Sequence, residues 1–309
     1  MTLTVLRTAD AWYLATAAGA AKIPTTATTT AELLADRAAI AAAGPFTDRV
    51  EDLALVSPVT APCRVVAQMT NFTSHVTDAG MDPKTVPLTF FRKSSGSISG
   101  PFDDVVKPPH VRLLDYEVEI GLVIGREIPV GSEITDPEEC VAGLVVTNDV
   151  SARDVQLPQT QFYEAKSYPT FTPAGPALVL LEAGELKRFA DLRLRLSVNG
   201  TARQNAVVGD DMIYRPLEAL RALARFQRLD PGDLVLTGTP AGTALSAPPK
   251  AVEKIAALLP PALKWKLFFK GQAKNPKYLA DGDVVEASVA TDDGALDLGT
   301  QRTVVRYRR

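Results

Sequence analysis

An apolar run at residues 113–125 constrains the fold more than any other part of the chain, because two glutamates stand inside a sequence that otherwise belongs in a protein core. Residues two apart on a β-strand point to the same face, so Glu117 and Glu119 should project together while Val118 and Ile120 face the opposite layer. A pair of this kind can also be the solvated face of an edge strand. The pair alone leaves both interpretations open.

A second run favours the interpretation in which the glutamates act together. Residues 141–147 are apolar and rich in β-branched side chains, and Asn148 and Asp149 follow them, a pattern typical of a buried strand that delivers one acid at its C-terminal end. Three acids among apolar neighbours would repel one another and lose hydration unless a cation lay between them. We therefore predict a metal site made by Glu117, Glu119 and Asp149.

The donor set indicates which metal to expect. Three carboxylates offer only oxygen, which suits hard cations, so we expect Mg²⁺ or Mn²⁺, with Ca²⁺ as an alternative. Zinc is disfavoured, because His75 and His110 are the only histidines and the two cysteines, Cys63 and Cys140, form no Cys-x-x-Cys pattern. Two cysteines are also too few for a disulfide scaffold, which fits a reducing cytoplasm.

Charge and hydropathy argue against two classes of partner. The formal net charge of −3 leaves no basic footprint for nucleic acid. No apolar stretch approaches the roughly 20 residues that a membrane helix needs. We expect a soluble cytoplasmic protein that binds neither nucleic acid nor membrane.

The remaining pattern predicts an α+β fold that is mostly β. Residues 1–58 should form a small N-terminal α+β domain, with a helix over residues 31–43 that Gly44-Pro45 stops, and residues 59–309 should form the main domain. Asn199-Gly200 predicts a hairpin. The main domain should contain strands at 114–124, 141–147, 177–181, 192–198, 233–237, 284–289 and 303–306, and a helix at 216–226 should interrupt them.

Four further residues are candidates for holding a substrate. Arg153 lies four residues after Asp149, on a segment that starts at a strand end, where a guanidinium can grip a carboxylate through two hydrogen bonds. Gln156 follows on the same segment. Gly238 and Thr239 lie in a tight loop after a strand, where small residues let backbone N–H groups and the hydroxyl approach a ligand anion.

Four motifs in this order resemble those of the fumarylacetoacetate hydrolase family, and the resemblance covers most of residues 61–309. It implies a folded β-roll or mixed β-sandwich for the main domain, a homodimer, and a metal-dependent enzyme. The motifs are Asp115-Tyr-Glu-Val-Glu119, Thr147-Asn-Asp-Val-Ser-Ala-Arg-Asp-Val-Gln156, Phe162-Tyr-Glu-Ala-Lys-Ser167 with Pro173-Ala-Gly-Pro176, and Pro231-Gly-Asp-Leu-Val-Leu-Thr-Gly-Thr-Pro-Ala-Gly242.

The resemblance also implies catalytic roles. Lys166 matches the family lysine that neutralises oxygen charge near the metal. His75 occupies the place of the first residue in the family's His-x-x-Glu motif, and Asp78 stands where the glutamate is usual. If Thr73 caps a short helix that ends before Gly80, His75 and Asp78 share one face and form a base with its orienting acid.

The function we expect is hydrolysis of a carbon–carbon bond in an acylpyruvate or another β-diketo acid. In this hypothesis His75, helped by Asp78, activates water, and the leaving group is an enolate stabilised by the metal with Lys166 nearby. Decarboxylation, isomerisation or hydration of a keto acid on the same metal site is the alternative. A relative that binds ligand without catalysis is a third.

The resemblance implies that one segment is unusually long, because compact relatives cross the same gap with far fewer residues. Residues 241–281 should be an insertion that contains an amphipathic helix at 249–259, followed by the basic and aromatic sequence of residues 264–270. Because the segment leaves directly from a substrate loop, Trp265 or Phe268 is expected to wall the mouth of the pocket. A packing or dimer role is the alternative.

Overall fold

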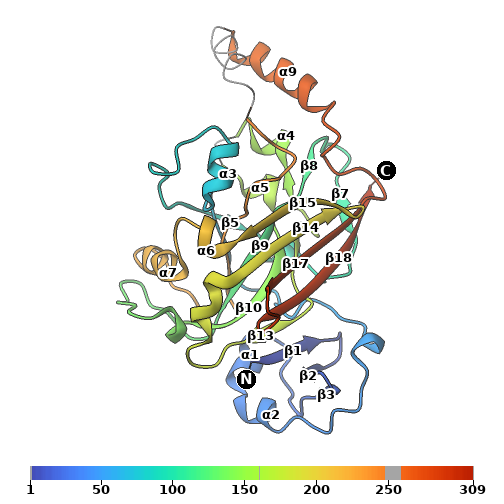
Figure 1. Ribbon diagram of the computed structural model, residues 1–309, viewed down its shortest axis with the longest axis vertical. Helices are drawn as coiled ribbons and strands as arrows, with labels where there is room; N and C mark the ends of the chain where they lie inside the picture. The colour runs from blue at the N-terminus through green and yellow to red at the C-terminus, as the bar shows by residue number, and fades with distance from the viewer. Residues whose placement is uncertain (1, 160, 248–258, 309) are drawn as a thin grey trace.

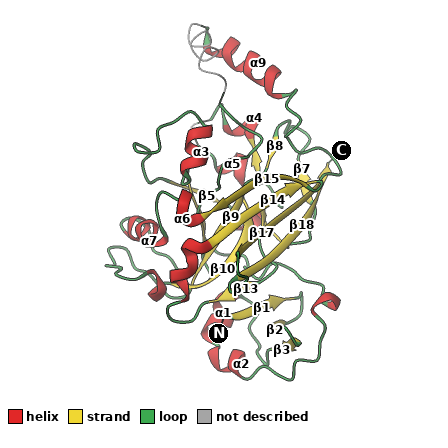
Figure 2. Ribbon diagram, in the orientation of Figure 1, coloured by secondary structure: helices red, strands yellow, loops and turns green. Residues whose placement is uncertain are grey.

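The computed structural model describes residues 2–159, 161–247 and 259–308, and its strands form two main sheets that pack face to face (Figures 1 and 2). Strands β9 and β10 of the first sheet contact β14, β17 and β18 of the second. The first sheet has the order β3 (Gly19–Lys22), β2 (Trp12–Thr16), β1 (Leu3–Arg7), β13 (Leu178–Leu180), β10 (Val141–Asn148), β9 (Val118–Ile124), β16 (Leu234–Leu236), β4 (Val65–Gln68) and β5 (Phe90–Lys93). The second has the order β15 (Thr201–Val207), β14 (Leu192–Val198), β17 (Val284–Thr291), β18 (Asp297–Tyr307) and β7 (Val105–Lys107).

Short elements decorate the two sheets. There are two further two-stranded sheets. One pairs β11 (Ser151–Ala152) with β8 (Leu114–Asp115), and the other pairs β12 (Thr172–Pro173) with β6 (Ile98–Ser99). The described α-helices are α1 (Thr30–Ala35), α2 (Arg37–Ala41), α3 (Thr73–Asp78), α4 (Arg153–Gln156), α5 (Tyr163–Lys166), α6 (Val208–Asp211), α7 (Pro216–Ala224) and α9 (Pro261–Gln272). The 3₁₀ turns are Val50–Asp52, Ser95–Ser97, Pro137–Glu139 and Glu185–Asp191. None of the described helices has the length and apolar character that a membrane span requires. The prediction of a mostly β, α+β fold is confirmed.

The core lies between the two sheets, and β9 runs through its centre with both faces buried. Val118 and Ile120 pack into this core, on the opposite side of the strand from Glu119, as the alternation of side chains predicts. Gly121 leaves room for its neighbours, because a Cβ there would lie 2.7 Å from Val145 Cγ1 and 2.8 Å from Leu234 Cδ1. Tight strand packing therefore holds Glu119 at a defined position.

The prediction of one strand over residues 114–124 is wrong, because Tyr116 and Glu117 separate β8 from β9. Side chains replace the strand hydrogen bonds at this point. The N–H of Tyr116 donates to Asp115 Oδ1 at 2.9 Å, and the N–H of Glu117 donates to Asn148 Oδ1 at 2.9 Å. The break places Glu117 outside the regular pleat.

The predicted helix over residues 31–43 is also wrong in its extent, because it divides into α1 and α2 at Asp36. The Asp36 backbone leaves the helical region, and its carboxylate accepts a hydrogen bond from the N–H of Ala39 at 3.2 Å, which starts the second helix. The expected cap of α3 differs too. The helix begins at Thr73, and the carboxylate of Asp211 accepts from the N–H of Ser74 at 2.7 Å.

The N-terminal strands extend the first sheet of the main domain. Strand β1 pairs with β13 in antiparallel register, with Leu3 opposite Leu180 and Val5 opposite Leu178. Leu33 of α1 joins the same buried cluster as Val65 of β4. The boundary at residue 58 remains a prediction, and the sheet continues across it.

Candidate active site and metal centre

Glu117, Glu119 and Asp149 meet where β9 and β10 run side by side. Antiparallel pairing sets Thr147 opposite Glu119, and the N–H of Asp149 donates to the Glu117 carbonyl at 2.8 Å. The three side chains are buried, and one oxygen from each lies within 4.8 Å of the others. Oxygens that share one hard cation at roughly 2.0–2.6 Å lie at most about 5 Å apart. The three acids therefore fit a divalent cation.

Two buried lysines contact the same acids. The ammonium of Lys166 donates to Glu117 Oε2 at 2.8 Å and to Asp149 Oδ2 at 2.6 Å. The ammonium of Lys93, at the end of β5, donates to Asp149 Oδ1 and to the Phe171 carbonyl. Lys166 was predicted, whereas Lys93 was missed. The only sequence signal for Lys93 is its place at the end of a strand-like Phe-Phe-Arg-Lys run.

The two glutamates have different charge environments. Burial alone would raise the pKa of Glu117, but the neighbouring Lys166 and Arg153 outweigh burial and hold that pKa far below its usual range. Burial raises the pKa of Glu119, and the charges of Asp149 and Glu117 raise it further. Glu119 is thus the acid that a bound cation would stabilise most.

The pKa values of the two lysines are shifted in opposite directions. Burial opposes the charged form of Lys166, but Asp149 and Glu117 together outweigh it and raise the pKa of that ammonium. Burial is the dominant influence on Lys93, whose pKa is lowered although Asp149 pulls in the opposite direction. The positive charge of Lys166 is therefore more strongly stabilised beside the three acids than the positive charge of Lys93.

The guanidinium of Arg153 contacts two acids of the site, and its role in substrate binding stays a prediction. Its guanidinium donates to Asp115 Oδ2 at 2.8 Å, to Gln156 Oε1 at 2.8 Å and to Glu117 Oε1. Asp115 in turn accepts from the N–H of Ala244 at 2.8 Å. Arg153 and Gln156 both border the cavity described below, and the hydrogen bonds of Arg153 orient Glu117.

The Gly238 loop holds Glu119 from the other side. The N–H of Gly238 donates to Glu119 Oε2 at 2.7 Å, and the Thr239 hydroxyl donates to the Val118 carbonyl at 2.8 Å. Gly238 has a φ of +88°, and a Cβ there would lie 2.8 Å from the Cβ of Asn71. Both the backbone conformation and the close approach require glycine.

Replacing Gly238 with alanine is therefore expected to lower the free energy of unfolding by about 1–3 kcal/mol and to weaken metal binding, because the loop must move away from Glu119. Thermal unfolding and metal titration would measure the two effects. Gly131→Ala is the matched control, since Gly131 has a φ of +84° but no atom within 4 Å of the new Cβ. Equal losses in both variants would contradict the steric argument.

A cavity of about 410 Å³ opens beside the three acids. His75 of α3, Lys166, Glu117, Glu119, Gly238 and Thr239 all line it. His75 Nδ1 is buried and has no hydrogen-bond partner among the described residues, and burial lowers the pKa of the imidazole. The fold thus brings the predicted base and the predicted lysine to one cavity with the carboxylates.

Asp78 is not brought to this cavity. It ends α3, one turn after His75, and no hydrogen bond or ion pair joins the two side chains in the described part of the chain. Its carbonyl accepts a hydrogen bond from the N–H of Ala247 at 3.0 Å. The acid that should orient His75 is therefore not in place in this structure.

Helix α9 (Pro261–Gln272), which belongs to the predicted insertion, projects from the end of the molecule opposite the N-terminal strands (Figure 1). Residues 264–270 lie within the helix α9, and Phe268 lines the cavity. Trp265 stacks on Phe269 at a centroid distance of 5.5 Å and contacts Phe268 edge to face at 5.8 Å. The predicted helix at 249–259 lies, except for residue 259, outside the described residues.

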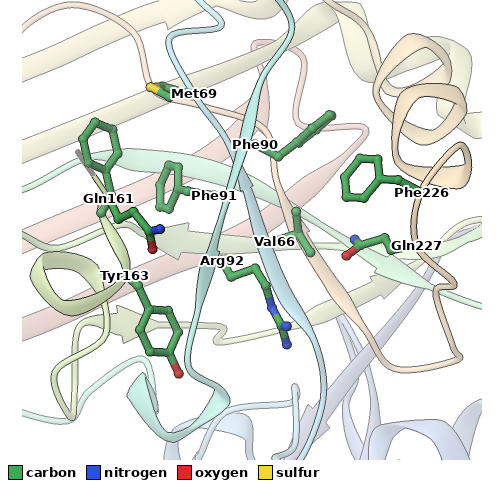
Figure 3. A pocket seen from close by; sticks show the side chains of 10 residues that line it. Val66, Met69, Phe90, Phe91, Arg92, Gln161, Tyr163, Phe226 and Gln227 are labelled. Carbon is green, nitrogen blue, oxygen red and sulfur yellow. The ribbon is translucent and has the colours of Figure 1, made fainter.

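A second, larger cavity of about 500 Å³ lies next to the first and contains none of the three acids (Figure 3). The two cavities share Met69, Phe91 and Phe162 as a common wall. Phe91 packs edge to face on Phe162, and its ring centroid lies 5.3 Å from Lys166 Nζ. This aromatic wall lies between the cavity beside the acids and the second cavity, and Phe91 packs against Lys166.

The family model described as "Fumarylacetoacetate (FAA) hydrolase C-terminal" matches residues 64–306. The chain belongs to the fumarylacetoacetate hydrolase family of enzymes, as its motifs indicate.

Relatives and solved structures agree with this placement. The chain is 35% identical to the human (Homo sapiens) mitochondrial oxaloacetate tautomerase, over 71% of this chain and 68% of that protein. It is 33% identical to a 2,4-didehydro-3-deoxy-L-rhamnonate hydrolase from Sphingomonas sp. (strain SKA58), over 80% of this chain and 75% of that protein. The crystal structure of a probable 2-hydroxyhepta-2,4-diene-1,7-dioate isomerase from Mycobacterium abscessus superposes with a TM-score of 0.76 at 29% identity, covering 100% of both chains. The predicted family and fold class are confirmed.

Proposed function

We propose that this protein is a divalent-cation-dependent enzyme that interconverts the keto and enol forms of a small 2-oxo acid. The observation that carries the proposal is that His75 and Lys166 line one cavity with Glu117 and Glu119, while His75 Nδ1 makes no hydrogen bond with Asp78 or any other described residue. Moving a proton between carbon and oxygen needs a base and a stabilised oxygen charge. It does not need the oriented water that hydrolysis requires.

Glu117, Glu119 and Asp149 would hold the cation, with Mg²⁺ or Mn²⁺ favoured by the all-oxygen donor set. A bound cation supplies Lewis acidity, which polarises the 2-oxo group and lowers the cost of removing a proton from the adjacent carbon. Arg153 keeps Glu117 ionised and correctly turned through its hydrogen bond.

The chain's own residues move the proton. His75, kept neutral near pH 7 by the burial that lowers its pKa, accepts the proton from the carbon next to the 2-oxo group and returns it to oxygen, and the reverse path consumes the enol. The ammonium of Lys166 stabilises the negative charge that develops on oxygen during the transfer. The aromatic wall of Phe91 and Phe162 limits the access of water.

Hydrolysis of a carbon–carbon bond is the second candidate, and the position of His75 in the cavity favours it. In that reaction His75 takes its proton from water, and Asp78 would have to turn toward the imidazole to orient it. The rhamnonate hydrolase named above supports this candidate, and the oxaloacetate tautomerase supports the first. A small anionic keto acid as substrate, a homodimer and a cytoplasmic location remain our predictions under either candidate.

Asp78 separates the two candidates. Asp78→Ala is expected to change the rate of enol conversion less than about threefold, and Asp78→Glu should be tolerated, because no hydrogen bond joins the acid to His75 Nδ1. The assay would follow the loss of enol absorbance and the release of carboxylic acid product by the protein with Mg²⁺ or Mn²⁺, on acyl pyruvates and on oxaloacetate. Rapid product release that falls about a hundredfold or more in Asp78→Ala would instead support the hydrolase.

A further inference from the structure

One buried amide beside the metal centre has no partner. Gln68 ends β4, its side chain is 2% exposed, and it lines the same cavity as His75 and Lys166. Its Nε2 is fully buried and makes no hydrogen bond with any described residue. A buried donor without a partner destabilises the folded protein, so a ligand atom is the natural candidate for the missing partner.

Several other buried amide side chains make hydrogen bonds within the protein. Gln204 donates to the Thr239 hydroxyl at 2.8 Å, Gln301 donates to the Val146 carbonyl at 2.7 Å, and Gln156 accepts from Arg153 at 2.8 Å. Asn71 donates to the Thr237 carbonyl, and Asn148 accepts from the N–H of Glu117. Gln227 Nε2 is the other amide nitrogen that is buried without a partner among the described residues, and Gln227 lines the second cavity, so Gln68 carries the unpaired amide of the cavity beside the acids.

The charges around the cavity limit what Gln68 can meet. The lysine and arginine side chains of the described lining are Lys166 and Arg153, and carboxylates already occupy both. The part of the lining contributed by Met81, Leu245 and Phe268 is apolar. A negatively charged group in that part would lose hydration without gaining a cation.

We propose that Gln68 determines specificity by donating a hydrogen bond to an uncharged oxygen, a ketone or a hydroxyl, on the tail of the substrate. The preferred substrate class is then a 2-oxo acid with an uncharged, partly apolar tail rather than a dicarboxylic acid. This inference rests on the proposed function only for the 2-oxo acid end, which the metal centre would hold. A site built to hydrogen-bond an oxygen discriminates strongly against ligands that cannot supply it.

Two probes of nearly equal size test the inference. Acetylpyruvate and oxaloacetate share the 2-oxo acid head and differ in a methyl ketone against a carboxylate. Calorimetric titration of the Mg²⁺-loaded protein should give an affinity at least about tenfold higher for acetylpyruvate, because its uncharged ketone can accept the hydrogen bond without burying a carboxylate among apolar side chains.

Gln68→Met keeps the side-chain length and removes the donor. It should weaken acetylpyruvate binding about tenfold and leave oxaloacetate binding within about threefold. Without ligand its melting temperature should equal or exceed that of the unchanged protein, because an unpaired buried amide is lost. Gln301→Met is the matched control, since it removes a paired amide away from the cavity and should lower the melting temperature while leaving the affinity ratio unchanged.

The possible failures are distinguishable. Tighter binding of oxaloacetate by the unchanged protein, or the same affinity ratio in Gln68→Met, overturns the role of Gln68 and leaves the proposed function standing. Binding of neither acid in the presence of Mg²⁺ overturns both. A lower melting temperature in ligand-free Gln68→Met with an unchanged ratio would make Gln68 a structural residue.

Discussion

Replacing Glu119 with glutamine is expected to abolish activity, with a loss of at least about a hundredfold, because the variant removes one of three carboxylates that would share the cation. The same change should remove the stabilisation that metal gives to the folded protein. At a metal concentration about one hundred times its dissociation constant, that stabilisation is about 2.7 kcal/mol. Thermal unfolding with Mg²⁺, with Mn²⁺ and with excess chelator would measure it.

The behaviour of metal-free Glu119→Gln makes this test specific. No lysine or arginine among the described residues pairs with Glu119, so its loss should cost little stability in chelator. Asp149→Asn is the contrasting control, because it removes the charge that Lys93 and Lys166 both contact and should lower the free energy of unfolding by about 3–5 kcal/mol. Full activity of the unchanged protein in excess chelator would refute the metal centre.

His75→Ala should lower the rate of enol conversion by about 10²–10⁴-fold while leaving metal binding intact, because the imidazole is the proposed proton acceptor and is not one of the three carboxylate ligands. Steady-state rates and the metal-dependent rise in melting temperature would be measured together. The expected signature is a lost rate with a preserved rise.

His110→Ala is the matched control for this prediction. His110 hydrogen-bonds the hydroxyl of Tyr168 at 2.7 Å and does not line the cavity, so its loss should change the rate less than about twofold. An unchanged rate in His75→Ala would exclude His75 as the base. If the same variant still decarboxylated a β-keto acid rapidly, Lys166 and the cation would be sufficient for that reaction. This result would support the decarboxylase alternative.

The local sequence pattern was sufficient to predict that Glu117, Glu119 and Asp149 form one cluster. The two-residue period of a strand is a property of the backbone itself, so the facing of Glu119 against Val118 and Ile120 followed from the sequence. The position of Asp149 followed from an apolar run that had to end at a polar residue. The order of the four motifs along the chain similarly indicates the family and the mostly β fold.

Residues whose roles depend on distant partners could not be predicted in this way. Lys93 acts through Asp149, which is 56 residues away, and Asp211 caps α3 through Ser74, which is 137 residues away. Arg153 has the residue type and position of a substrate clamp, but its partner Asp115 pairs with it only after β8 and β11 meet. The open amide of Gln68 is visible only when every neighbouring donor and acceptor has been placed.

The sequence by itself therefore determined the strands, the acid cluster and the family, because these depend on periodicity and on short motifs that survive without tertiary contacts. The tertiary structure alone decided which charges are already paired, where the strand breaks between Asp115 and Val118, and that His75 Nδ1 has no hydrogen bond to Asp78. The physical reason is that hydrogen bonds and ion pairs act over a few ångströms, and only folding brings residues far apart in the chain within that range.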